Sequence, residues 1–165
     1  MRTPMFSIIV VSLNPGHKLV DTMKSVAEQN YTDYEVIVKD GGSTDGSLEA
    51  LREYFSGDRE QTLFYVQRSP AQELSSGEGK NGAADKIVRE NVPVVRILEQ
   101  ADEGIYDGMN QAASAAQGEY LYFLNCGDTF ASGTSLKQAA GEIVLHIEAG
   151  AAAPGIFYGD IFDAM

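Results

Sequence analysis

One stretch of the sequence, residues 119–130 (EYLYFLNCGDTF), most limits what this chain can fold into. Its first half is a continuous run of aromatic and aliphatic residues, too short for a helix and without the polar alternation of a half-exposed strand. Its second half turns polar at Asn125 and continues through Cys126 and Gly127 to Asp128. The pattern predicts a central strand buried on both faces, with a carboxylate at its carboxyl end, where an open parallel sheet leaves its ligand crevice.

Similar apolar runs, each ended by a polar loop, recur along the chain. Strands are expected at residues 6–12, 34–39, 94–99 and 155–159. Helices are expected at about 17–29, at about 106–116 and at 135–149, and a further helix should follow a cap at Ser43 or Thr44. Because strands alternate with helices, the strands should be parallel and joined by right-handed crossovers. The sequence therefore predicts one α/β domain over residues 1–165, with a mostly parallel sheet flanked by helices.

Residues 56–93 interrupt this pattern. Residues 63–67 (LFYVQ) read as a short strand and residues 83–89 as a short helix, but the segment is otherwise rich in Ser, Gly, Glu and Lys. We interpret it as a surface insertion, and how much local structure it carries is left open.

Charge and cysteine usage narrow the partners and the compartment. The formal net charge of −12 and the lack of a dense Lys/Arg run argue against binding to nucleic acid or anionic lipid. The single Cys126 cannot form an internal disulfide, which favours a reducing compartment and hence the cytoplasm. No run approaches the roughly 20 apolar residues of a transmembrane helix. Peripheral membrane association of a full-length protein stays open.

Polar residues follow several of the expected strands, and all of these loops should meet at one edge of the sheet. They lie at residues 12–14, 40–45, 102–110 and 125–128. The glycine loops that usually grip phosphates are missing, since neither GxGxxG after the first strand nor a Walker A sequence is present. A phosphorylated ligand in this acidic chain would need a metal ion or backbone N–H donors.

Three segments carry a resemblance to a known family: FSIIVVSLN, YEVIVKDGGSTDGS and EQADEGIYDGMNQAASAAQGEYLYFLNCGD. In this order they resemble the nucleotide-sugar-binding half of family 2 inverting glycosyltransferases with the GT-A fold. The GIYDGMN and FLNCGD pieces are most similar to the bacterial branch that makes capsule and exopolysaccharide. The resemblance covers most of residues 5–160, apart from 56–93.

The resemblance implies a role for each matching residue. Asp40 matches an aspartate that accepts a hydrogen bond from the nucleotide base, and Val11, Ser12 and Leu13 match the loop that lines the base pocket. Asp128 matches the last acid of the metal motif and would hold Mn²⁺ or Mg²⁺ between the donor phosphates, although Asn125 and Gly127 replace acids common in that motif. The remaining implied nucleotide contacts are Asp102, Asp107, Asn110 and Asn125.

The implied reaction transfers a sugar from a nucleotide-diphospho-sugar to a hydroxyl of a saccharide or lipid-linked acceptor, with inversion at the anomeric carbon. UDP is the favoured nucleotide of the donor, and GDP stays open. The general base is expected beyond Met165, so the chain is expected to be the donor-binding portion of a longer enzyme. A non-catalytic nucleotide-binding or assembly module of the same fold is the open alternative, and a nucleotidyltransferase is disfavoured because SLNPGHK is a poor phosphate loop.

Overall fold

The computed structural model describes residues 3–56, 63–68 and 93–152. Five strands and four helices lie in these ranges: β1 (Phe6–Ser12), α1 (Lys18–Ala27), β2 (Tyr34–Asp40), α2 (Ser47–Ser56), β3 (Leu63–Arg68), β4 (Val94–Glu99), α3 (Ile105–Ala115), β5 (Tyr120–Phe123) and α4 (Ser135–Glu148). The expected alternation of strands and helices is confirmed, with most boundaries within two residues of the prediction.

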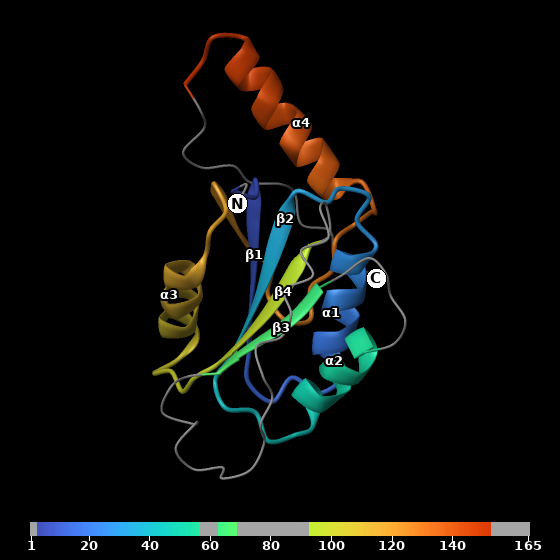
Figure 1. The fold of residues 1–165 in the computed structure, drawn as a ribbon, viewed down its shortest axis with the longest axis vertical. Helices are drawn as coiled ribbons and strands as arrows, with labels where there is room; N and C mark the ends of the chain where they lie inside the picture. The colour runs from blue at the N-terminus through green and yellow to red at the C-terminus, as the bar shows by residue number, and fades with distance from the viewer. Residues whose placement is uncertain (1–2, 57–62, 69–92, 153–165) are drawn as a thin grey trace.

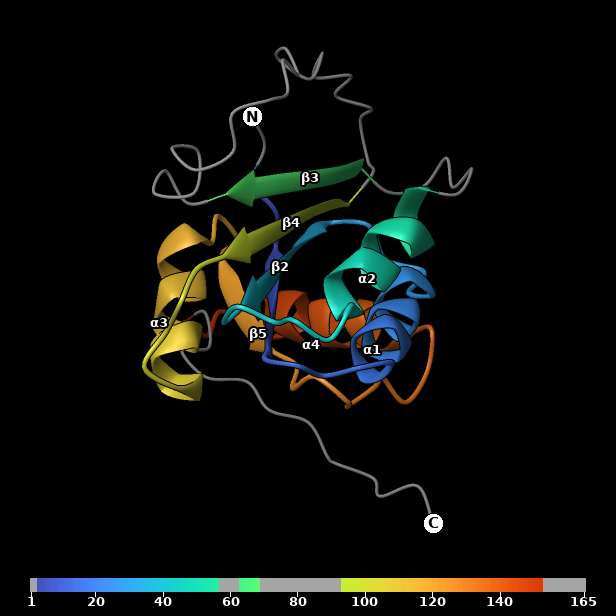
Figure 2. The same cartoon turned by 90° about the horizontal axis from the view of Figure 1, so that it is seen from below.

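The strands form one parallel sheet in the order β3-β4-β2-β1-β5. The register aligns Ser12 with Asp40 and Asp40 with Glu99, so that the three neighbouring strands end at nearly the same level. Figures 1 and 2 show α3 on one face of the sheet and α1 and α2 on the other. The loops that follow β1, β2 and β4 therefore leave the same edge.

Alternating side chains of β1 and β2 build a core on each face of the sheet. Ile8 and Val38 belong to the larger core, which includes Leu19 of α1 and Leu51 of α2. Ile9 and Ile37 point to the opposite face, where they pack with Ala112 of α3. Because both faces are covered, the middle of each strand is a continuous apolar run, IIVV in β1 and VIV in β2.

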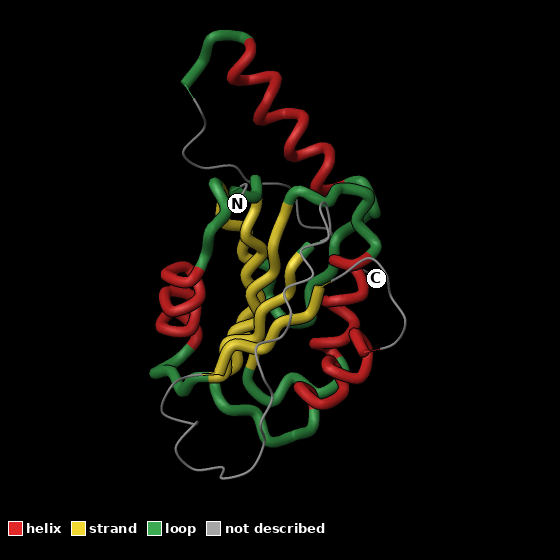
Figure 3. The backbone as a smooth tube through the Cα atoms, viewed as in Figure 1, coloured by secondary structure: helices red, strands yellow, loops and turns green. Residues whose placement is uncertain are grey.

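The position of α4 differs from that of the other helices. Its first turns pack on the larger core through Leu136, Ala140 and Ile143, whereas Leu145 is 60% exposed. Figures 1 and 3 show the helix extending beyond the amino-terminal end of the sheet, away from the loops that follow the strands. None of the helices in the described ranges has both the length and the apolar character needed to cross a bilayer.

The prediction of a central, doubly buried strand in residues 119–130 is wrong. β5 pairs with β1 and lies at the edge of the described sheet, and Leu121, Tyr122 and Phe123 are 44%, 37% and 45% exposed. A continuous apolar run predicts that both faces of a strand are apolar, but it does not predict which strands or helices lie next to it. No strand in the described ranges pairs with the outer side of β5.

Two other expectations have different outcomes. The short strand at 63–67 is confirmed as β3, so part of the 56–93 segment belongs to the sheet. The helix expected at 83–89 and the strand expected at 155–159 lie outside the described residues.

The start of α2 also departs from the prediction. Ser43 and Thr44 do not cap this helix, which begins at Ser47. Instead, Asp45 Oδ1 accepts hydrogen bonds from Ser47 N at 3.1 Å and from Ser47 Oγ at 2.6 Å. The Asp45 carboxylate therefore accepts a hydrogen bond from the Ser47 amide, which has no acceptor inside the helix.

Candidate functional site

A cleft of about 550 Å³ opens where β1 ends. It lies between the loop that follows β1 and the loop that follows β5. The residues that line it are Val11, Ser12, Leu13, Asn14, Pro15, Gly16, Lys18, Asp45 and Cys126. The three consecutive residues predicted to form a base pocket are thus part of the cleft wall.

Hydrogen bonds join the loop after β1 to the loop after β2. Asn14 N donates to Ser43 Oγ at 2.7 Å, and Asn14 Oδ1 accepts from Thr44 N at 2.8 Å. Gly16 N donates to Asp45 Oδ2 at 2.7 Å. Asn14 has a φ of 47°, an uncommon conformation for a residue other than glycine, and its bonds to the second loop hold it there. One wall of the cleft is therefore built from two loops that support each other.

Asp40 fixes the base of this wall from inside the protein. Its side chain is almost fully buried, and Oδ1 accepts from Ser12 Oγ at 3.1 Å and Ser43 Oγ at 2.6 Å. Oδ2 accepts from the amides of Gly42 at 2.9 Å and Ser43 at 2.7 Å. These donors occupy the usual acceptor positions of a carboxylate. The visible role of Asp40 is to shape the loop, and contact with a nucleotide base stays a prediction.

The loop that carries Asn125 and Asp128 is anchored on α1. Thr22 Oγ1 accepts from Gly127 N at 2.9 Å and donates to the main-chain oxygen of Asp128 at 2.9 Å, and Thr22 is fully buried. The Asp128 side chain is exposed, and its Oδ2 accepts from Asn125 Nδ2 at 3.2 Å. The carboxylate thus points outward from a backbone that is held in place by a helix.

Sequence reasoning missed this anchor. Thr22 and Ser25 of α1 are polar yet buried, and so is Gln29, which lies two residues after the helix. Ser25 Oγ accepts from Phe130 N at 3.2 Å, and Gln29 Nε2 donates to the Ser132 main-chain oxygen at 2.8 Å. One sequence signal could have identified these three polar residues. Ser25 follows Thr22 by three residues and Gln29 follows Ser25 by four, the same helical spacing that relates the apolar positions Leu19, Met23 and Val26 of α1.

Replacing Thr22 by Val should weaken the Asp128 loop while keeping the shape of the side chain. We expect a stability loss of about 1–2 kcal/mol, because Gly127 N and the Asp128 oxygen lose their partner. Mn²⁺-dependent affinity for UDP should fall by about tenfold. Thermal unfolding and calorimetric titration measure the two effects, and Thr22→Ser, which keeps the hydroxyl, should restore both. Wild-type affinity in Thr22→Val would refute the anchoring role.

The pKa of the Cys126 thiol is shifted by its surroundings in the cleft. Burial is the main cause that raises the pKa of its thiol to about 11; the Lys18 charge lowers this pKa, and the charges of Asp128, Asp40 and Asp45 raise it further. The thiol therefore stays protonated and is a poor nucleophile. Asp40 and Asp45 stand at and after the end of β2, and Asp128 follows β5, so carboxylates from two segments of the chain act on one thiol of the cleft lining.

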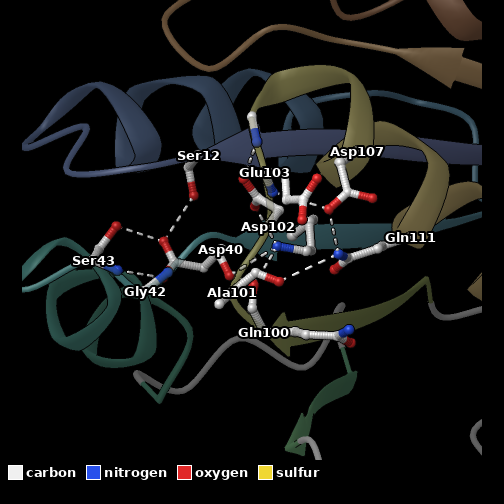
Figure 4. A network of polar contacts seen from close by, with 12 residues as sticks. Ser12, Asp40, Gly42, Ser43, Gln100, Ala101, Asp102, Glu103, Asp107 and Gln111 are labelled. Atoms are coloured by element: carbon white, nitrogen blue, oxygen red, sulfur yellow. Dashed lines mark hydrogen bonds and ion pairs between the residues drawn. The ribbon is translucent and has the colours of Figure 1, made fainter.

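Asp40, Asn125 and Asp128 are close to the cleft in the chain but are not among the residues that line it. The predicted site residues Asp102, Asp107 and Asn110 lie on the α3 side of the same edge and do not line it either. Figure 4 shows a chain of polar contacts that runs from Ser12 and Asp40 to Asp107 and Gln111. Asp107 Oδ2 accepts from Glu103 N at 3.0 Å and from Gln111 Nε2 at 2.8 Å, while Asn110 is exposed on α3. Asp102 is paired with Lys39, at 2.6 Å between Oδ2 and Nζ.

The residues at the cleft fit one kind of metal ion. Within the described ranges, no three His, Cys, Asp or Glu side chains gather into a group that could enclose a cation. Asp128 offers a single exposed carboxylate beside the Asn125 amide. Mg²⁺ and similar cations are often held by one or two carboxylates together with water and the phosphates of a substrate. The site fits a cation that arrives with phosphate and does not fit an all-protein cage.

The sequence of this chain is similar to those of known glycosyltransferases. Residues 7–77 match the family described as Glycosyl transferase family 2. A PGL/p-HBAD biosynthesis glycosyltransferase of Mycobacterium bovis is 27% identical over 161 residues, which cover 98% of this chain and 48% of that protein. A chondroitin synthase of Escherichia coli is 26% identical over 127 residues, or 77% of this chain and 14% of the synthase. The chain thus spans about half the length of the mycobacterial relative.

Solved structures share the fold. Residues 1–349 of S. aureus TarS, crystallised with UDP-GlcNAc, match with a TM-score of 0.57 and 25% identity over 86% of this chain and 32% of that one. The mannosyltransferase PcManGT of Pyrobaculum calidifontis, in complex with GDP-Man and Mn²⁺, matches with a TM-score of 0.58 and 18% identity over 85% of this chain and 32% of that one. The expected α/β fold of the GT-A type is confirmed.

Proposed function

We propose that this chain is the donor-binding portion of a family 2 glycosyltransferase, which transfers a sugar from a nucleotide-diphospho-sugar to an acceptor hydroxyl with inversion. The observation that carries the proposal is the position of the Asp128 loop, which is held by Thr22 beside a cleft at the carboxyl end of β1. The match of residues 7–77 to Glycosyl transferase family 2 supports it independently.

The cleft suggests how a donor would lie. The nucleoside would rest against Val11, Ser12 and Leu13, which line the wall that the Asp40 loop supports. The diphosphate would lie toward Asp128 and Asn125, with Lys18 as a further positive charge on the cleft lining. Asp107 and Asn110, on the α3 side, are proposed to face the ribose or the donor sugar. UDP is the favoured nucleotide, and GDP is the alternative.

The chemistry assigned to these residues is binding and orientation. In the proposed displacement, the acceptor oxygen forms a bond to the anomeric carbon of the donor sugar. At the same time the bond between the anomeric carbon and the diphosphate oxygen breaks, and the electron pair of that bond leaves with the nucleotide diphosphate. A Mn²⁺ or Mg²⁺ ion bound at Asp128 would offset the negative charge on that leaving group. A general base must take the acceptor proton. The identity of this base stays a prediction, as do the acceptor class, the capsule or exopolysaccharide role and the cytoplasmic location.

Calorimetric titration of the chain with UDP and with GDP, each with and without Mn²⁺, tests the binding claim. We expect saturable binding of one of the two that tightens by at least about tenfold when Mn²⁺ is present, because the cation joins two anionic partners. No binding of either nucleotide in the presence of Mn²⁺ would refute the proposal. Turnover of UDP-sugars and GDP-sugars by a full-length protein would then separate an enzyme from a nucleotide-binding module.

A further inference from the structure

A lysine is completely buried at the carboxyl end of β2, directly before Asp40. Lys39 Nζ donates to the main-chain oxygen of Asp40 at 3.1 Å, to that of Gln100 at 2.5 Å and to Asp102 Oδ2 at 2.6 Å. A buried ammonium group is costly unless it is paired, and these three acceptors match its three donors. Lys39 therefore joins the end of β2 to the segment that follows β4.

Asp102, the partner of Lys39, is enclosed by protein. Its side chain is 10% exposed, and Oδ1 accepts from Gly104 N at 3.1 Å. A Cβ atom at Gly41 would lie 2.9 Å from Asp102 Oδ2, and one at Gly108 would lie 3.3 Å from it. Glycine at both positions lets the loop after β2 and the helix α3 close on the carboxylate. The hydrogen bond from Lys39 is the main cause that lowers the pKa of Asp102, so the Asp102 carboxylate is charged at neutral pH.

The pair is connected to the wall of the cleft. Lys39 bonds the main-chain oxygen of Asp40, whose carboxylate holds Ser12 of the cleft lining. The loop that begins at Gly41 continues to Asp45, which also lines the cleft and bonds Gly16. Figure 4 shows Asp40 and Asp102 as neighbouring parts of one polar network. A shift of the Asp102 segment would therefore reach the cleft through Lys39.

We propose that Lys39 and Asp102 form a positioning pair that holds the loop after β2 against α3 and thereby shapes the nucleotide-binding cleft. In this proposal Asp102 acts through Lys39 and does not touch the nucleotide, since its side chain is only 10% exposed and each of its oxygens accepts a hydrogen bond inside the protein. This inference rests on the proposed function for its ligand. It differs from a direct role of Asp102 as a nucleotide ligand in two measurable ways.

The first test is a double-mutant cycle with Asp102→Asn, Lys39→Met and the variant that carries both. Each is titrated with UDP, or with GDP if that is the nucleotide the wild type binds, in the presence of Mn²⁺. If the two residues act as a pair, each single change weakens binding by about tenfold and the double change weakens it no further than the worse single one. Independent losses that multiply to about 100-fold would overturn the inference. Wild-type affinity in Asp102→Asn would overturn it as well.

A second buried ion pair supplies the matched control. Arg96 Nη2 lies 2.7 Å from Glu35 Oε2, with side chains 14% and 7% exposed, and it also joins β2 to β4. Glu35 stands at the opposite end of β2 from the cleft. Glu35→Gln should lower the unfolding temperature and leave the nucleotide affinity of the folded protein unchanged. An affinity loss equal to that of Asp102→Asn would mean that general loosening of the sheet explains both, which would overturn the specific role of Lys39 and Asp102.

The second test needs no nucleotide. Amide hydrogen exchange of ligand-free Asp102→Asn should be about tenfold faster at Gly42, Ser43 and Gly104, because the pair no longer holds their loops. A residue that served only as a ligand would leave these rates unchanged, and that result would overturn the inference. This comparison also decides the case if Lys39→Met does not fold. If the wild type binds neither nucleotide, the proposed function fails, whereas the exchange rates still test the pair.

Discussion

Replacing Asp128 by Ala should remove most of the Mn²⁺-dependent affinity for the nucleotide, a loss of roughly 100-fold. The exposed carboxylate of Asp128, two residues after Cys126 of the cleft lining, is the group proposed to hold the cation, and its backbone is held by Thr22 of α1. Affinity measured without Mn²⁺ should change little, because the wall of the cleft is built by other loops. Calorimetric titration with UDP and GDP, with and without Mn²⁺, measures both quantities.

A charge-matched control separates a local effect from a change in net charge. Glu142 is exposed on α4, which lies beyond the amino-terminal end of the sheet. Glu142→Ala removes one negative charge, as Asp128→Ala does, and should leave the titrations unchanged. If Asp128→Ala responds to Mn²⁺ as strongly as the wild type does, the cation is not held at Asp128 and the metal assignment is wrong.

Replacing Gly118 by Ala should destabilise the domain by roughly 3 kcal/mol or more. A Cβ atom there would lie 2.5 Å from Ser7 N and 2.6 Å from the carbonyl carbon of Phe6. Both are backbone atoms of β1, so relief requires the strand to move. The Gly118 amide, which donates to Ser7 Oγ at 2.7 Å, would move with it. Chemical denaturation followed by circular dichroism measures the loss.

The same substitution elsewhere provides the control. Gly141 lies on the exposed side of α4, and a Cβ atom there meets no atom within 4 Å. Gly141→Ala should therefore stabilise the protein by about 0.5–1 kcal/mol, because alanine favours a helix more than glycine does. If Gly118→Ala were as well tolerated as Gly141→Ala, the close approach between Gly118 and β1 would be incorrect.

Local pattern was enough to predict the strands and helices that the structure describes. The runs FSIIVVS and VVRILE coincide with β1 and β4, because apolar β-branched residues between polar loops leave few alternatives. The meeting of Ser12, Asp40 and Asp128 at one edge follows from the parallel order of the strands. These features depend on neighbours in sequence or on topology that the alternation itself dictates.

Contacts across long stretches of sequence could not be predicted in the same way. Lys39 lies inside a run that reads as a buried strand, and its partner Asp102 is 63 residues away. Thr22 meets Gly127 and Asp128 more than 100 residues later. The edge position of β5 depends on which strands pair, which the apolar run does not encode. In each case the sequence supplied the chemical group, while its role depends on the assembled fold.

The central claim is that the cleft at the end of β1 receives a nucleotide diphosphate together with a cation at Asp128. Broadening of amide resonances by Mn²⁺ tests it most directly, with the 165-residue chain saturated with UDP or GDP in Mg²⁺ and Mn²⁺ then added in trace amounts. The account predicts that the amides of Cys126, Gly127 and Asp128 broaden first, followed by those of Leu13, Asn14 and Gly16. Broadening centred elsewhere, or spread evenly over the exposed carboxylates, would contradict it.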